Sequence, residues 1–442
     1  MNRADLVSRD KRYVWHPYTA MQSYVDGTDP LVISAAEGSF LYDVDGTRYL
    51  DANGSWWVSA FGHRHPTMVR ALVEQANALP HCSLAGCTHE PAALLAEQLV
   101  ALAPGALASE LGAERKLEHV FYSDNGSTAV EVAVKMAVQY WLQNGRPART
   151  RFVTLEHAFH GETVGATSVG GLDVFRSMFG SILFDVVRVP SPSSGWERCV
   201  EAIATVLATE GDTIAGVVLE PLVQGAGGML VHPPEFLRAV RELCLRADTF
   251  LVIDEVFTGF GRTGTAFACD QAGVVPDLLC LAKALSGGMM PFAATLATRR
   301  IYDGFLGDRS RAFYYGHSYC GNPLGARVAL AALQVFHDEK IVEQVVRKAP
   351  RVRERFERIA ANVPGARNAR SCGLVGALDL GGGGYLAEAG WKVYAAARRR
   401  GVYLRPLGDV VYIAPALNIP DDVLDELLDV VEGAVSEAVA GG

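Results

Sequence analysis

One lysine stands where proteins seldom place a charge. Residues 278–281 form an uninterrupted apolar run, Lys283 follows between two alanines, and Gly287 and Gly288 end the stretch. Such a run is typical of a strand that is buried on both faces of a parallel sheet. Burial lowers the pKa of a lysine, and the neutral amine can then attack a carbonyl carbon. The same stretch is also compatible with a lysine that extends from a strand end to the surface.

A carboxylate is expected close to this lysine. Residues 250–253 form another apolar run, and Asp254 follows it directly. The two runs are consecutive predicted strands joined by one crossover connection. Because the carboxyl ends of parallel strands meet at one edge of the sheet, Asp254 and Lys283 should lie near each other.

An anion site and an aromatic ring are expected further upstream. The polar turn with Gly126 and Ser127 leads into a mostly apolar helix. The free N–H groups and the positive dipole end of such a helix favour a phosphate. Ser127 or Thr128 could equally act only as a helix cap. Phe159 stands near a glycine at a strand end, where its ring could stack on a flat ligand or belong to the core.

These four segments match the needs of pyridoxal 5′-phosphate. That cofactor requires an amine for its aldehyde, a carboxylate for its ring nitrogen, an anion site for its phosphate and an aromatic face for its ring. The carboxylate keeps the ring nitrogen protonated, so that the ring can accept electrons from a substrate carbon. No single segment is specific, but the four together, in this order, predict a pyridoxal phosphate enzyme.

Two other motifs suggest different chemistry. Residues 259–264, GFGRTG, fit the G-x-G-x-x-G pattern of a nucleotide-dependent oxidoreductase. The preceding strand, however, ends in Asp254 and Glu255, which would lie against a pyrophosphate, and no strong helix begins at the motif. His63 and His65 could bind a metal, but no third ligand accompanies them, so structural roles are expected.

The sequence resembles the class III (ω-amino) aminotransferases over nearly its whole length. The motifs that carry the resemblance are SDNGSTAVEVAVKMA (123–137), FHGET (159–163), EPLVQGAGG (220–228), DEVFTGFGRTG (254–264), LAKALSGG (281–288), GNPLG (321–325) and LRPLGD (404–409). The resemblance implies an α/β protein of pyridoxal phosphate fold type I, with a large, mostly parallel domain and a smaller α+β domain. It also implies a homodimer whose active sites lie at the subunit interface.

The same resemblance implies roles for individual residues. Lys283 would hold the cofactor, would be displaced by the donor amine and would then shuttle a proton, while Asp254 would bind the ring nitrogen. Ser318 would reach the phosphate of the partner subunit's cofactor.

Within the family, WHPYT (15–19), SWW (55–57) and residues 121–141 are most similar to members that aminate 8-amino-7-oxononanoate in biotin biosynthesis. By that similarity Arg405 would hold the substrate carboxylate. The substrate pocket would be formed by Tyr18, Trp56, Trp57, Gly316, Arg262 and Arg405.

Three residues depart from the pattern of that branch. The usual YHGD is here FHGE, so Phe159 lacks a hydroxyl and Glu162 is one methylene longer, and Phe257 replaces a common alanine. The stretch from residue 316 to 410 is more similar to the form that uses lysine as amino donor. The N-terminal motifs favour S-adenosylmethionine as the donor, with lysine as the alternative. Another class III enzyme acting on a diamine or an ω-amino acid is a further alternative.

Composition and charge argue against several classes of binding partner and cellular location. The 442 residues carry a formal net charge of -9, which argues against nucleic acid or an anionic membrane as the main partner. We expect no membrane span and no signal peptide, because no apolar run is long enough and the N-terminus is charged. The eight cysteines include no CxxC and are expected to be reduced thiols of a cytoplasmic protein without a metal centre.

Alternating helical and strand patterns set the expected architecture. Helices are predicted over 197–209 and 234–246, between strands at 215–219 and 250–253, which favours an open, largely parallel sheet. Three segments are predicted: 1–60, which joins the smaller domain and the pocket, 61–325 as the large cofactor-binding domain, and 326–442 as the smaller domain.

The adjacent Trp56 and Trp57 are expected on a strand, where they would point to opposite faces. Both could belong to the core or to a dimer interface, or one could line a ligand pocket.

Overall fold

A seven-stranded sheet forms the centre of the computed structural model, which describes residues 1–27, 29–108 and 112–440. The strand order is β4 (Leu117–Ser123), β12 (Ala293–Thr298), β11 (Leu278–Leu281), β10 (Phe250–Asp254), β7 (Ile214–Leu219), β5 (Arg151–Leu155) and β6 (Val186–Val189). Neighbouring strands from β11 to β6 are parallel. Among these seven strands, β12 alone points in the opposite direction, and it pairs antiparallel with β11 and β4. The predicted mostly parallel α/β sheet is thus confirmed.

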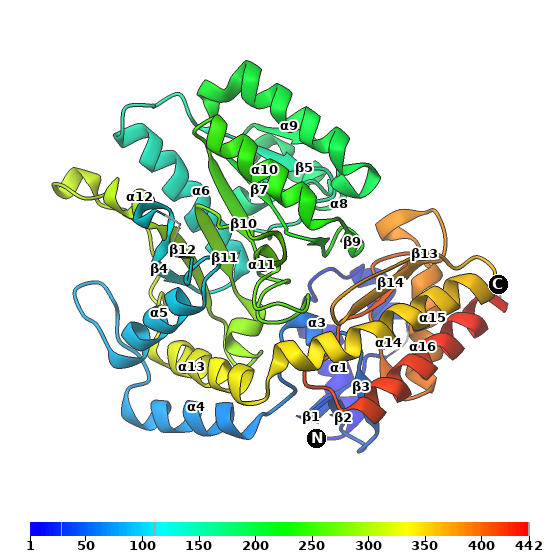
Figure 1. Ribbon diagram of the computed structural model, residues 1–442. Helices are drawn as coiled ribbons and strands as arrows, with labels where there is room; N and C mark the ends of the chain where they lie inside the picture. The colour runs from blue at the N-terminus through cyan, green and yellow to red at the C-terminus, as the bar shows by residue number, and fades with distance from the viewer. Residues whose placement is uncertain (28, 109–111, 441–442) are drawn as a thin grey trace.

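Helices cover the sheet and explain its apolar runs. Every residue of β7, β10 and β11 is buried, so these strands carry no alternation of polar and apolar side chains. The covering helices include α6 (Gly126–Gln143), α9 (Trp196–Glu210) and α10 (Pro234–Arg246) (Figure 1). Next to them, α13 (Pro323–Asp338) packs against α4 (Pro66–Ala78), α5 (Glu90–Leu102) and the 3₁₀ turn η5 (Lys283–Ser286).

A buried ion pair helps to set the register of the two central strands. The Asp277 carboxylate, just before β11, accepts hydrogen bonds from the backbone N–H of Leu251 at 2.8 Å and from Arg241 Nη1 at 2.6 Å. The backbone N–H of Asp277 in turn donates to the Leu251 carbonyl at 2.9 Å. The start of β11 is therefore tied to β10, and the ends that carry Lys283 and Asp254 are fixed relative to each other.

The two ends of the chain meet in one smaller region. Strands β1 (Ile33–Glu37), β2 (Phe40–Asp43) and β3 (Arg48–Asp51) form a sheet that β15 (Val402–Tyr403) completes by pairing in parallel with β3. A second sheet consists of β13 (Arg367–Cys372), β14 (Val375–Asp379) and β16 (Val410–Ile413). This pairing supports the predicted grouping of residues 1–60 with 326–442, and the domain boundaries stay a prediction.

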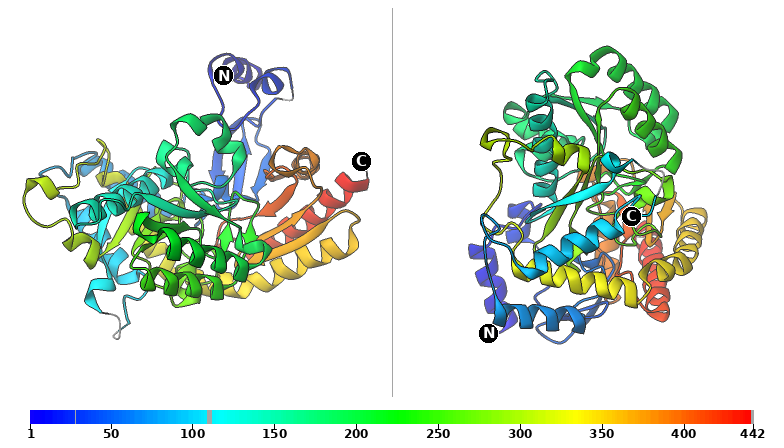
Figure 2. Two further views of the ribbon diagram at one scale, coloured as in Figure 1. Left: turned by 90° about the horizontal axis from the view of Figure 1, so that it is seen from above. Right: turned by 60° about the vertical axis from the view of Figure 1, so that its left-hand side comes forward.

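Long helices cover this smaller region. Helices α14 (Ile341–Asn362) and α16 (Asp421–Ala440) run side by side, and α15 (Ala389–Arg399) packs on α16 (Figure 1). Near the N-terminus, α1 (Arg3–Tyr13) stands out from the body beside the first strands (Figure 2). No sequence pattern noted above predicts α15.

The remaining elements are short. They are α2 (Met21–Asp26), α3 (Gly54–Trp57), α7 (Val164–Ser168), α8 (Asp173–Arg176), α11 (Ala268–Ala272), α12 (Arg299–Asp303), β8 (Val223–Gln224), β9 (Leu230–Val231), η1 (Ala113–Arg115), η2 (Ser177–Ile182), η3 (Pro192–Ser194), η4 (Gly211–Thr213), η6 (Arg309–Arg311) and η7 (Gly384–Leu386). In the described ranges we find no helix with the length and apolar character needed to cross a membrane.

The expectation that the two tryptophans lie on a strand is wrong. They end the short helical turn α3, in which Ser55, Trp56 and Trp57 have φ values of 45°, 65° and 73°. This left-handed backbone is strained for residues with a side chain. Contacts made by the rings, described below, hold the turn in this conformation.

We expect Asp277→Ala to lower the free energy of unfolding by about 3 kcal/mol, because it leaves the Arg241 guanidinium buried without its partner. Urea denaturation measures the loss. Glu235→Ala is the matched control, since it breaks the exposed Glu235–Arg238 pair on the same helix and should change stability little. Equal losses in the two variants would contradict the role assigned to Asp277.

Candidate active site

Lys283 occupies a strained position directly after β11. It begins η5 with a φ of 45°, and strained backbone of this kind is concentrated at functional sites. Its side chain is half-buried, and its Nζ lies 4.9 Å from the centre of the Trp57 ring. Burial lowers the pKa of Lys283, although the charges of Asp254 and Glu220 act in the opposite direction. A lysine in this setting holds a proton less firmly than a surface lysine does.

Asp254 ends the neighbouring strand and is buried. Its Oδ2 accepts a hydrogen bond from His160 Nδ1 at 2.8 Å, and its Oδ1 accepts one from the backbone N–H of Val256 at 3.0 Å. Burial opposes a charge on His160, but the hydrogen bond and the charge of Asp254 outweigh it and raise the pKa of the imidazole. Both contacts hold the Asp254 carboxyl group in one orientation at the edge of the sheet.

Glu220 is a second buried carboxyl group at the same edge of the sheet. It accepts hydrogen bonds from the backbone N–H groups of Phe159 at 3.0 Å and Gly225 at 2.8 Å. Burial is the main cause that raises the pKa of Glu220 to about 7, and the charge of Asp254 adds to it. Glu220 therefore positions the backbone that carries the Phe159 ring.

The N-terminus of α6 forms a close-packed cradle next to these groups. The N-cap of α6 is Asn125, and not Ser127 or Thr128 as the sequence suggested. Asn125 forms a capping box with Thr128. A Cβ atom on Gly126 would lie 2.7 Å from a Val256 methyl group, and one on Gly161 would lie 2.1 Å from Ser127 Oγ. Only glycine fits at either position, so the backbone approaches the space at the helix end closely.

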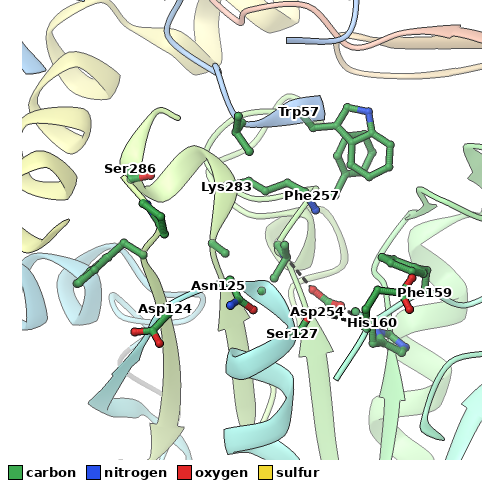
Figure 3. A pocket seen from close by; sticks show the side chains of 18 of the residues that line it. Trp57, Asp124, Asn125, Ser127, Phe159, His160, Asp254, Phe257, Lys283 and Ser286 are labelled. Atoms are coloured by element: carbon green, nitrogen blue, oxygen red, sulfur yellow. Dashed lines mark hydrogen bonds and ion pairs between the residues drawn. The ribbon is translucent and has the colours of Figure 1, made fainter. Parts of the chain in front are cut away.

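A cavity of about 490 Å³ joins these groups, and its volume is in the usual range for a small-molecule site. Figure 3 shows Lys283 between the Trp57–Phe257 pair on one side and Asp254 on the other, with Ser127 and Phe159 nearby. Trp57 and Phe257 pack with ring centres 4.5 Å apart, and Trp57 Nε1 donates to the Tyr412 hydroxyl at 3.1 Å. These contacts anchor the strained turn α3 over the cavity.

The cavity suits the predicted cofactor. A ring held there would have the Asp254 carboxylate and the Phe159 face within the lining, and the N–H groups of the α6 N-terminus are available for a phosphate. The amine of Lys283 faces the same space. Donor types, burial and volume thus agree with pyridoxal phosphate, while the roles of the individual residues stay predictions.

The predicted substrate residues fall into two groups. Tyr18 lines the cavity, and its hydroxyl donates to Glu162 Oε1 at 2.9 Å. Trp56 lies 5.0 Å from the Tyr18 ring, and the Arg405 guanidinium lies over the other side of this aromatic cluster, 4.6 Å from the Trp56 ring. Tyr18, Trp56 and Trp57 form an aromatic wall, with Arg405 against Trp56. Tyr18 and Trp57 line the cavity, whereas Trp56 and Arg405 do not belong to its lining.

Three residues that were predicted to bind substrate or cofactor do not line the cavity of this chain. Gly316 and Ser318 are exposed on the loop after η6 and do not line the cavity. Arg262 is buried, and its Nη1 donates to the Pro415 carbonyl at 2.7 Å. Burial lowers the pKa of Arg262 to about 9. The structure thus does not bring Arg262 to the cavity lining, because its side chain is used to hold the loop before α16.

Two residues near the centre had been given no role from the sequence. His160 and Glu220 stand inside the motifs FHGET and EPLVQGAGG, but their partners are 94 and 61 residues away in the chain. Glu220 stands directly after a fully apolar run, as Asp254 does. This position is the sequence signal that could have predicted a functional role for Glu220.

The histidines and the glycine-rich motif have structural positions. His63 Nε2 pairs with Asp51 at 2.9 Å, and His65 pairs with Glu339 at 2.9 Å and caps α4. Residues 259–264 form turns and no helix begins there, in agreement with the sequence argument against a nucleotide site.

In protein freed of cofactor, stability should fall as the pH rises from about 4.5 to about 7, in part because of Glu220. Its pKa is raised to about 7 from an ordinary value of 4.5, so the folded protein retains a proton that the unfolded chain releases in that interval. Glu220→Gln should remove up to about 3 kcal/mol of this decline. Urea denaturation across the pH range measures it.

The slope with pH is the diagnostic quantity, because loss of one acceptor oxygen will also lower stability at every pH. Glu156→Gln, at an exposed glutamate after β5, is the control and should keep the wild-type slope. An unchanged slope in Glu220→Gln would contradict a titrating Glu220.

Known proteins of similar sequence and structure agree with a pyridoxal phosphate site in this cavity. The family model for class-III aminotransferases matches residues 23–435. The adenosylmethionine-8-amino-7-oxononanoate aminotransferase of Geobacter sulfurreducens is 40% identical over 98% of this chain and 97% of its own. The crystal structure of the protein of that name from Methanocaldococcus jannaschii has a TM-score of 0.93 at 34% identity and covers 99% of both chains.

An amine transaminase from an uncultivated Pseudomonas species, solved in its PLP-bound form, has a TM-score of 0.88 at 31% identity and covers 97% of this chain and 98% of its own. The resemblance, the fold type and the cofactor expected from the sequence are confirmed. The chain belongs to the class-III aminotransferases and is a pyridoxal 5′-phosphate-dependent transaminase of fold type I.

Proposed function

We propose that this transaminase converts 8-amino-7-oxononanoate to 7,8-diaminononanoate, the reaction of 7,8-diaminopelargonate synthase in biotin biosynthesis. The observation that carries the proposal is the aromatic wall of Tyr18, Trp56 and Trp57, which ends at Arg405. The keto substrate is a long apolar chain with a terminal carboxylate. It needs an apolar path from the reacting centre to a distant cation, and a guanidinium can bind its carboxylate through two hydrogen bonds.

The relatives support the same assignment, since those named above with 40% and 34% identity carry the name of an aminotransferase acting on 8-amino-7-oxononanoate. We propose S-adenosylmethionine as the amino donor. Its adenosyl group offers a large flat surface, and the exposed face of Tyr18 beside Trp56 suits such a group.

The roles of the residues follow from their chemistry. Bound pyridoxal phosphate supplies an aldehyde that carries the amino group and a ring that accepts electrons. Lys283 Nζ would hold the cofactor, and its free amine would take up and return a proton at the substrate carbon. Asp254 holds the proton on the ring nitrogen, and His160 orients Asp254. The Gly126 and Ser127 backbone at the helix end binds the phosphate.

Other residues shield the reaction. Phe159 covers one face of the ring, and Trp57 and Phe257 exclude water above Lys283. Tyr18 and Glu162 form a polar pair at the open side of the cavity. Burial raises the pKa of Glu162, against the effect of the Tyr18 hydrogen bond, and the approach of a cationic donor would favour its carboxylate form.

We further propose a cytoplasmic homodimer with shared active sites. Ser318 and Gly316 would complete the partner's site, because both are exposed on a loop that does not reach the cavity of its own chain. Tyr314 and Tyr319 on this loop are 80% and 63% exposed, as expected for a surface that a second copy covers. The eight cysteines are free thiols, which suits a reducing compartment.

Arg405→Ala should lower kcat/KM for 8-amino-7-oxononanoate by about 10- to 100-fold, because two charged hydrogen bonds to the carboxylate are lost. Arg405→Lys should recover little of this, since an ammonium group cannot form the two parallel bonds. Steady-state kinetics with a saturating donor measures the effect. Arg399→Ala, at the surface Arg399–Glu437 pair, should behave as wild type. A change within about twofold in Arg405→Ala would remove the main support for the assignment.

The donor assay is the direct test of the proposed reaction. Purified enzyme should form 7,8-diaminononanoate from the keto substrate with S-adenosylmethionine, and product is measured by mass spectrometry. Turnover with lysine alone would indicate the lysine-dependent form. Rapid turnover of diamines or ω-amino acids, with none of the keto acid, would overturn the proposal in favour of another class III activity.

A further inference from the structure

Three potential metal ligands from distant parts of the chain lie together beside the cavity. Asp124 precedes α6, and His317 and Cys320 lie on the loop between η6 and α13. Asp124 Oδ2 lies 2.6 Å from His317 Nδ1, and Cys320 Sγ lies 3.5 Å from the same nitrogen. One ligand atom from each residue lies within 4.8 Å of the other two.

The contacts around this cluster are those of a metal site. The second ring nitrogen of His317, Nε2, lies 3.1 Å from the Tyr315 hydroxyl. Metal-binding histidines usually have such a partner on the nitrogen that faces away from the metal, because it fixes the orientation of the ring. The other oxygen of Asp124, Oδ1, is buried and has no hydrogen-bond partner within the described ranges. A buried acceptor without a partner is costly, and a cation bound to the Asp124 carboxylate would offset part of that cost.

We propose that Asp124, His317 and Cys320 form a binding site for a thiophilic divalent cation, with Zn²⁺ as the best match. Thiolate, imidazole and carboxylate are the ligand types that zinc prefers. One thiolate and one carboxylate also neutralise the two charges of the ion.

The spacing is close to that of a tetrahedral zinc site. Bond lengths of about 2.0–2.3 Å place neighbouring donor atoms about 3.3–3.8 Å apart. The distance between Cys320 Sγ and His317 Nδ1 is already in this range. The shorter Asp124–His317 contact is a hydrogen bond, and it must lengthen by about 0.7 Å when a metal takes the place of the shared proton.

Proton movements accompany binding. Cys320 would release its thiol proton to solvent, against the burial that raises the pKa of this thiol. His317 would bind the ion through Nδ1 with its proton on Nε2, and the Tyr315 hydroxyl oxygen would accept a hydrogen bond from it. In the single chain the side chains of His317 and Asp124 are 31% and 30% exposed, which leaves space for a water molecule to complete the coordination.

The site would connect two parts of the molecule. Asp124 lines the cavity next to the N-cap of α6, whereas His317 and Cys320 flank Ser318 on the loop. A bound ion would therefore fasten this loop to the start of α6, and Lys283 and Asp254 are not among its ligands. No local sequence pattern indicates such a site, because 193 residues separate Asp124 from His317.

Equilibrium dialysis of the holoenzyme against Zn²⁺, followed by metal analysis, tests the proposal. We expect about one zinc ion per chain, and at least tenfold weaker binding in Cys320→Ser and in Asp124→Asn. Cys82→Ser is the matched control, because Cys82 is also partly exposed but lies outside the cluster, and it should bind as wild type. No turnover is measured, so the result does not depend on the proposed substrate.

A second readout uses the wild-type holoenzyme alone. Zn²⁺ should slow alkylation of Cys320 by iodoacetamide at least tenfold, as followed by peptide mass spectrometry, and EDTA should restore the rate. The proposal would be overturned if Cys320→Ser bound zinc as tightly as wild type, or if Cys82→Ser lost zinc binding instead. It would also be overturned if zinc did not change the rate of Cys320 alkylation.

Discussion

A buried carboxylate at the end of a central strand is the constraint on which the rest of the site depends. Asp254 cannot be buried as an anion without donors, and it obtains them from His160 and the Val256 backbone. His160 is in turn held in a buried position near Glu220, which anchors the backbone of Phe159. The two buried carboxyl groups Asp254 and Glu220 thus position His160 and the Phe159 backbone at one edge of the sheet, close to Lys283.

The smaller region also contributes residues beside the active-site cavity. The parallel pairing of β15 with β3 brings Arg405 next to the strained turn that carries Trp56 and Trp57. The backbone N–H of Arg405 donates to Asn53 Oδ1 at 2.6 Å, directly before that turn. The aromatic wall and its terminal cation are thus one unit, held by contacts between the two ends of the chain.

These features explain which parts of the account could be predicted from the sequence. Lys283 and Asp254 were predictable because fully buried parallel strands leave uninterrupted apolar runs, and a charge after such a run is conspicuous. The turn at Trp56 and Trp57 was not, since contacts with Tyr412 and Phe257 override local preference. The partners of Glu220 and His160, and the position of Arg262, depend on side-chain contacts across the fold that no local pattern encodes.

The central claim is that Asp254 acts on the chemical step by holding a proton on the cofactor ring nitrogen. A single-turnover experiment with Asp254→Asn tests it most directly, because stopped-flow mixing with the amino donor separates binding from chemistry. The account predicts that the rate of the chemical step falls at least about 10²-fold, while the dissociation constant of the donor changes by less than about threefold. An unchanged rate with weakened donor binding alone would contradict the account.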